Sequence, residues 1–110
     1  MIPDLSPDAE LLLQKLADKA RRDKSIGPYR ITEELLKELG FDSEKALAKA
    51  VNCLHAHAHD FKAQWGNGPI VRIEEESDEL VPGPFMKDCW GYYRAERRYA
   101  AEIERERTQD

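Results

Sequence analysis

The sequence has few cysteines and no long apolar run. Its two cysteines, Cys53 and Cys89, do not form a CxxC motif, which argues against a disulfide framework. No uncharged apolar run is longer than Leu11 to Leu13, far below the roughly 20 residues that span a membrane. The first six residues lack the basic and apolar regions of a signal peptide. We therefore expect a reduced, cytoplasmic protein that does not insert into a membrane.

The sequence also lacks an excess of positive charge. It has 17 Lys and Arg against 22 Asp and Glu, a formal net charge of −5. Five acids near the C-terminal third account for this imbalance: Glu74, Glu75, Glu76, Asp78 and Glu79. With 110 residues, of which 41% are hydrophobic and 35% charged, the chain is long enough for one globular domain with its own core.

Capping residues and apolar spacing predict two helices in the first forty residues. Ser6-Pro7-Asp8 is typical of a helix start, and the apolar residues that follow recur on one face as far as Lys24. Thr32 is expected to cap a second helix that ends at Gly40, because glycine readily adopts the left-handed backbone conformation that often ends a helix. The short stretch Tyr29–Ile31 between them is predicted to be an extended link or a minimal strand.

The second half is predicted to contain two more helices and a hairpin. A long amphipathic helix is expected over residues 43–65, ended by Gly66-Asn67-Gly68-Pro69. Ile70–Ile73 reads as a strand, followed by an acidic turn and a weak return strand at Leu80-Val81 that Pro82 would interrupt. A last helix is expected from Lys87 to about Arg107.

The segment Thr32–Leu54, two amphipathic helices joined by a Gly-containing turn, resembles the winged helix-turn-helix superfamily. The resemblance implies a mostly α (α+β) fold, with a winged-helix-like three-helix core, a short β-hairpin and an added C-terminal helix. It divides the chain into a domain at residues 1–86 and a helical extension at 87–110, packed on the same domain. In this superfamily the helix after the turn usually enters the DNA major groove, and the hairpin often contacts the DNA backbone through Lys or Arg. The resemblance would give these roles to Ser43–His59 and to Ile70–Val81.

The residues expected to face DNA depart from that pattern. The outward side of the third helix carries Lys45, Lys49 and Asn52 but no Arg, which makes it a poor reader of base edges. The five acids lie where a DNA-binding wing would be basic, and each would oppose a phosphate. A DNA-binding transcriptional regulator that uses the helix at residues 43–65 is therefore the alternative function. An inhibitor whose acidic hairpin imitates nucleic-acid phosphates is a third.

The three histidines do not complete a metal site. His55 and His59 share a helix face, whereas His57 points away from them and neighbours Cys53, so that two incomplete pairs result. No phosphate-binding loop, G-x-S-x-G or HExxH motif is present. We expect no metal, no cofactor and no enzymatic activity.

Small and aromatic residues instead point to an interface. Ala48, Asn52 and Ala56 make one side of the third helix small, so that either the C-terminal helix or another protein can approach closely. In the C-terminal helix, Trp90, Tyr93 and Arg97 form a stripe roughly opposite a second stripe, made up of Tyr92, Ala95, Tyr99 and Ile103.

The preferred function is thus a non-enzymatic regulatory or protein-interaction module. Its partner would be another protein or a second copy of the chain. The predicted interface residues are Trp90, Tyr93, Arg97, Ala56, His55 and His59.

Overall fold

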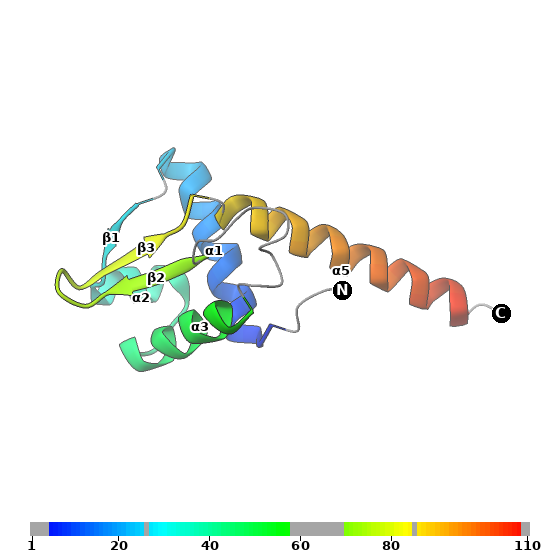
Figure 1. Ribbon diagram of the computed structural model, residues 1–110, viewed down its shortest axis with the longest axis horizontal. Helices are drawn as coiled ribbons and strands as arrows, with labels where there is room; N and C mark the ends of the chain where they lie inside the picture. The colour runs from blue at the N-terminus through cyan, green and yellow to red at the C-terminus, as the bar shows by residue number, and fades with distance from the viewer. Residues whose placement is uncertain (1–4, 26, 58–69, 85, 109–110) are drawn as a thin grey trace.

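The computed structural model describes residues 5–25, 27–57, 70–84 and 86–108. This part of the chain contains four helices and a three-stranded antiparallel sheet, a mostly helical α+β architecture. The elements are α1 (Pro7–Asp23), β1 (Tyr29–Arg30), α2 (Glu33–Leu39), α3 (Glu44–Ala56), β2 (Val71–Glu74), β3 (Glu79–Pro82) and α5 (Met86–Thr108). The first three helices surround one side of the sheet, and α5 runs away from it toward the C-terminus (Figure 1). None of the described helices is both long and apolar enough to cross a membrane.

The predicted start of α1 is confirmed. The Ser6 hydroxyl accepts a hydrogen bond from the Ala9 N–H at 3.2 Å, and Pro7 occupies the first turn, where its missing N–H costs nothing. Lys24, in the left-handed conformation, ends the helix. The face of α1 predicted to be apolar is buried in the core, with Ala17 buried beside it: Ala9, Leu12, Leu13, Leu16 and Ala20.

The turn between α2 and α3 also forms as expected. Thr32 caps α2 by accepting from the Leu35 N–H at 3.1 Å. Gly40 ends the helix with a φ of +86°, and a Cβ added there would lie 3.2 Å from a methyl of Leu11. Both facts favour glycine. Ser43 then caps α3.

Helix α3 is shorter than predicted. The sequence pattern predicts a helix over residues 43–65, but the helix ends at Ala56, and His57 has left the helical conformation with φ −97° and ψ 6°. The His57 N–H still bonds to the Cys53 carbonyl at 3.2 Å, which closes the last turn. The remainder of the predicted helix, with Phe61 and Trp65, lies outside the described residues.

The hairpin is more regular than Pro82 suggests. β3 runs through to Pro82 and pairs with β2 on one side and β1 on the other, in the order β1-β3-β2. The Gly83 N–H bonds to the Ile70 carbonyl at 2.7 Å, so that the neighbouring pair, Val71 and Pro82, is one that exchanges no hydrogen bonds. The nitrogen of Pro82 therefore faces away from β2, and its missing N–H leaves the β2–β3 ladder intact.

The acids of the hairpin divide between its strands and its turn. Glu74 and Glu79 are cross-strand partners, an unfavourable pairing of like charges. Each has an arginine neighbour, since Arg72 forms an ion pair with Glu74 and Arg30 is the register partner of Glu79 on β1. The turn itself holds Glu75, Glu76 and Asp78, all exposed.

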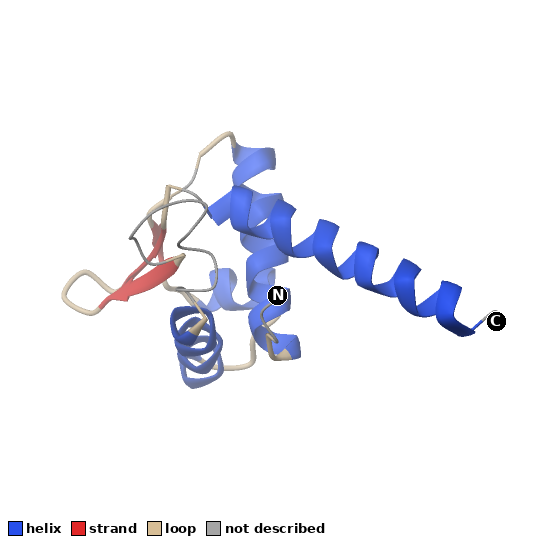
Figure 2. Ribbon diagram, turned by 45° about the vertical axis from the view of Figure 1, so that its right-hand side comes forward, coloured by secondary structure: helices blue, strands red, loops and turns tan. Residues whose placement is uncertain are grey.

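Helix α5 docks on the core through its first turns. Met86, Cys89 and Tyr93 are at most 3% exposed and belong to the core, whereas Tyr99, farther along the helix, is 61% exposed. Trp90 and Tyr92, one from each predicted stripe, are both half-buried against the core. The Tyr93 hydroxyl donates to a carboxylate oxygen of Glu10 at 3.0 Å, which ties α5 to α1. Beyond this contact no described helix or strand lies beside α5 (Figure 1 and Figure 2). Of the two expected occupants of the small face of α3, the C-terminal helix is therefore not the one, since it packs on α1.

Candidate functional site

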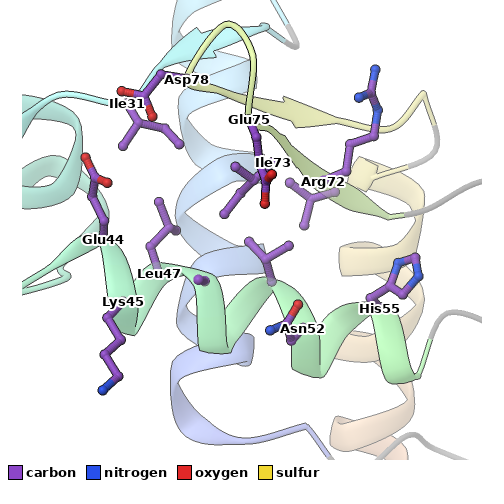
Figure 3. A pocket seen from close by; sticks show the side chains of 13 residues that line it. Ile31, Glu44, Lys45, Leu47, Asn52, His55, Arg72, Ile73, Glu75 and Asp78 are labelled. Atoms are coloured by element: carbon purple, nitrogen blue, oxygen red, sulfur yellow. The ribbon is translucent and has the colours of Figure 1, made fainter.

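A groove of about 620 Å³ lies between α3 and the β2–β3 hairpin (Figure 3). Its walls come from segments far apart in the sequence, because the hairpin folds back over the helix that precedes it. The groove is lined by Ile31, Glu44, Lys45, Leu47, Ala48, Val51, Asn52, His55, Val71, Arg72, Ile73, Glu75 and Asp78.

The floor of the groove is apolar. Leu47 and Val51 of α3 and Val71 of β2 all line it, and all three are buried. Ala48 and Ile73 are half-buried beside them, so they offer accessible apolar surface within the groove. The floor exists because apolar residues recur every three or four positions on α3 and every second position on β2.

The helix side of the groove contains residues predicted for two different functions. Lys45 and Asn52, from the predicted DNA-binding set, are exposed and line the groove, and so does His55 from the predicted interface. Lys49 and Ala56 are exposed on α3 but do not line it. His59 lies outside the described residues. In Figure 3, Lys45 points away from the hairpin.

The hairpin side of the groove is acidic. The Glu75 side chain points from the hairpin turn toward α3, and Asp78 lies nearer to Ile31 (Figure 3). Arg72 points away from α3 and is engaged with Glu74. Of the predicted acidic surface, Glu75 and Asp78 therefore face the groove, and Glu74, Glu76 and Glu79 do not line it.

The predicted interface residues of α5 lie elsewhere. Tyr93 is 1% exposed, so its ring is part of the core and not of an open surface. Trp90 is half-buried, with its ring centroid 6.2 Å from that of Tyr93, and the Arg97 guanidinium lies 5.9 Å from the Tyr93 ring. These three side chains lie in a row along α5, and the middle one, Tyr93, is buried and therefore closed to a partner.

No protein-family model, curated protein or solved structure matches this chain.

Both cysteines lie in the described segments, and neither is in a disulfide. Cys89 is 3% exposed, and burial, with a smaller contribution from Asp88, raises the pKa of its thiol to about 11, so that almost none is thiolate at neutral pH. Cys53 is half-buried. Within these segments no three His, Cys, Asp or Glu side chains lie close enough together to hold one metal ion.

One charged cluster was not predicted from the sequence. Glu38 of α2 accepts hydrogen bonds from Lys19 and Arg22 of α1, so that it joins the two helices. Burial would lower the pKa of Lys19, but its bonds to Asp23 and Glu38 outweigh burial and raise it. Lys19 also lies 5.0 Å from the centroid of the Tyr29 ring. The three charged residues on α1 follow helical spacing, but nothing local in the sequence indicates that Glu38 faces them.

Most groove residues belong to no functional site predicted from the sequence, and Glu44 and Ile73 are two examples. Glu44 lies in the first turn of α3, where an acidic residue stabilises the helix start, so its presence in the sequence has a local explanation. Ile73 fits the alternation of apolar and polar residues that is usual in a strand. Only the fold of the hairpin over α3 places both at the same groove.

Proposed function

We propose that this protein is a non-enzymatic regulatory or protein-interaction module of winged-helix-like fold, which binds a segment of a partner protein in the groove between α3 and the hairpin. The observation that carries the proposal is the groove itself, with an apolar floor and polar walls on two sides. Protein-binding sites commonly combine such a desolvated centre with a polar rim. The cytoplasm is the proposed location.

The order of elements supports the winged-helix-like arrangement. Helix, strand, helix, helix and hairpin follow one another as the resemblance of Thr32–Leu54 implies, and β1 adds to the hairpin beside β3. In such an arrangement the third helix and the hairpin lie next to each other. The groove between them is then the natural place for a partner.

A groove-blocking variant tests the proposal. A random peptide library displayed on phage is selected against the wild-type protein, and the enriched peptides are measured on Ala48→Trp, in which the indole fills the groove. We expect binding to weaken at least about tenfold. The matched control is Lys49→Trp, which places the same side chain on the adjacent, exposed position outside the groove and should leave binding within about twofold.

Two controls keep this test decisive. Circular dichroism and urea unfolding establish that each variant is folded, and Asn52→Trp at the exposed rim replaces Ala48→Trp if the latter is unfolded. A library that yields no binding peptide refutes the proposed function. So do peptides that bind Ala48→Trp and Asn52→Trp as tightly as the wild type.

DNA binding is a second candidate, favoured by the exposure of Lys45, Lys49 and Asn52 on α3. A gel shift at low salt with mixed-sequence duplex DNA tests it. Saturable binding that is lost in the double variant Lys45→Glu, Lys49→Glu would favour this candidate over the peptide groove, because phosphate contacts depend on those cations. Absence of a shift would eliminate it.

The residues of α5 that were predicted to form an interface give a second proposal, in which two copies of the chain associate through this helix. Of the three α5 residues in the predicted interface, Arg97 is exposed and Trp90 half-buried, whereas Tyr93 is buried. Sedimentation of the wild type beside Trp90→Ala tests it. A strictly monomeric wild type rules out the homodimer.

A further inference from the structure

Three carboxylates surround the groove without a partner of opposite charge. Glu44 belongs to the first turn of α3, whereas Glu75 and Asp78 belong to the hairpin turn. Glu44 points up from α3 on the side of the hairpin, and Glu75 points down toward the helix (Figure 3). Among the described residues, no cationic side chain lies within ion-pair distance of any of these three.

The cationic side chains at the groove do not neutralise these acids. Arg72 is paired with Glu74 and points away from α3, and Lys45 points away from the hairpin (Figure 3). His55 and Asn52 lie farther along α3, beyond Ala48. The open side of the groove therefore presents negative charge above an apolar floor.

We propose that the groove binds a segment of a partner protein that carries Lys or Arg beside apolar residues. This inference rests on the proposed function and specifies the partner. The apolar side chains of such a segment would lie against Ala48 and Ile73, and its cationic groups would reach Glu75, Asp78 and Glu44. The longer stems of Lys and Arg also cover apolar surface while their charged ends reach outward, which suits an apolar floor with acids at its rim.

The arrangement of the three acids favours a basic protein segment over a metal ion and over nucleic acid. The three carboxylates are not close enough together to share one metal ion, so separate cationic side chains match them better than a single ion does. A phosphate backbone would be repelled by all three. The charge therefore selects a basic peptide over DNA for this groove.

Defined peptides test the inference. The probes are fluorescein-labelled hexapeptides with a Leu-Val-Ala-Leu centre, flanked at both ends by Lys, by Gln or by Glu. Fluorescence anisotropy at low salt should give the tightest binding for the Lys-flanked peptide and the weakest for the Glu-flanked one. In Glu75→Lys the Lys-flanked peptide should bind roughly tenfold more weakly, because an exposed attraction becomes a repulsion of similar size.

The hairpin offers a matched control. Glu76 is exposed and adjacent to Glu75 but does not line the groove, so Glu76→Lys changes the net charge equally and should leave binding within about twofold. Equal losses in the two variants overturn the inference, since they would show a nonspecific response to net charge. Equal binding of Lys-flanked and Gln-flanked peptides to the wild type also overturns it. The proposed function survives that result if library peptides still depend on Ala48.

Two other occupants of the groove are separate outcomes. Displacement of the Gln-flanked peptide by a DNA duplex would assign the groove to nucleic acid and overturn the inference; the Lys-flanked peptide is not used for this step because it binds the phosphates of DNA directly. The projecting part of α5 carries Arg97, Arg98 and the exposed Tyr99, a chemistry that could suit the groove of a second copy. Concentration-dependent self-association that Glu75→Lys abolishes and Glu76→Lys preserves would assign the groove to that second copy, and would likewise overturn the inference.

Discussion

The contact between Tyr93 and α1 predicts a large difference between two tyrosines of the same helix. Tyr93 is 1% exposed and Tyr99 is 61% exposed, although only six positions separate them. Tyr93→Ala removes a buried aromatic ring and leaves a cavity, so we expect a loss of about 3–5 kcal/mol in unfolding free energy. That is a large share of the roughly 5–15 kcal/mol typical of a domain. Tyr99→Ala, the matched control, should cost no more than about 0.5 kcal/mol.

A conservative variant separates the ring from its hydroxyl. Tyr93→Phe keeps the ring and removes only the 3.0 Å hydrogen bond to Glu10. Because Glu10 is half-buried and its carboxylate can turn to water, the expected loss is about 1 kcal/mol, a decrease in Tm of roughly 5 °C. Urea and thermal unfolding followed by circular dichroism measure all three variants.

The result that refutes this reasoning is a similar, small loss in Tyr93→Ala and Tyr99→Ala. It would mean that α5 is not held on α1 through Tyr93. A change in sedimentation without a change in unfolding free energy would return Tyr93 to the predicted interface. A large loss of stability confirms its place in the core.

Other parts of the molecule give smaller, separate predictions. Gly40→Ala should lower the unfolding free energy by about 1–2 kcal/mol in urea titrations, because φ is +86° at that position; no loss would contradict the left-handed cap. Glu38→Gln should cost less than about 1 kcal/mol, since its exposed ion pairs are screened by water, and the loss should shrink in about 0.5 M salt. In the native protein at about pH 8, maleimide should modify Cys53 and leave Cys89 unmodified, by mass spectrometry. The raised pKa predicts that thiolate at Cys89 increases tenfold per pH unit up to about 11, and rapid labelling at pH 8 would contradict its burial.

Helix starts and ends could be predicted because their causes are local. Ser6, Thr32 and Ser43 each accept a hydrogen bond from an N–H three residues ahead, and Gly40 meets a conformational requirement of its own backbone. Such interactions lie within a few positions of the sequence. Continuing α3 beyond Ala56 was a wrong prediction, since apolar periodicity shows which face would be buried and not where the backbone leaves the helix.

Proline and the stripes of α5 show why local patterns are incomplete. A proline breaks a strand pair only if its nitrogen faces the partner strand, and the register with Val71 decides that for Pro82. Both stripes of α5 contain aromatic residues, so the sequence favours neither. Tyr93 is buried because the start of α5 packs on α1, whose Glu10, 83 positions earlier, lies beside it.

By itself, the sequence determined the helix caps, the apolar faces of α1, α2 and α3, and the concentration of acidic residues near the hairpin. These features depend on the chemical nature of neighbouring residues. Only the tertiary structure decided which polar residues share a groove, because Glu44 and Asn52 of α3 meet Glu75 and Asp78 through the fold of the hairpin. Contacts of that kind arise from the packing of two apolar faces, and their polar rims come together as a consequence.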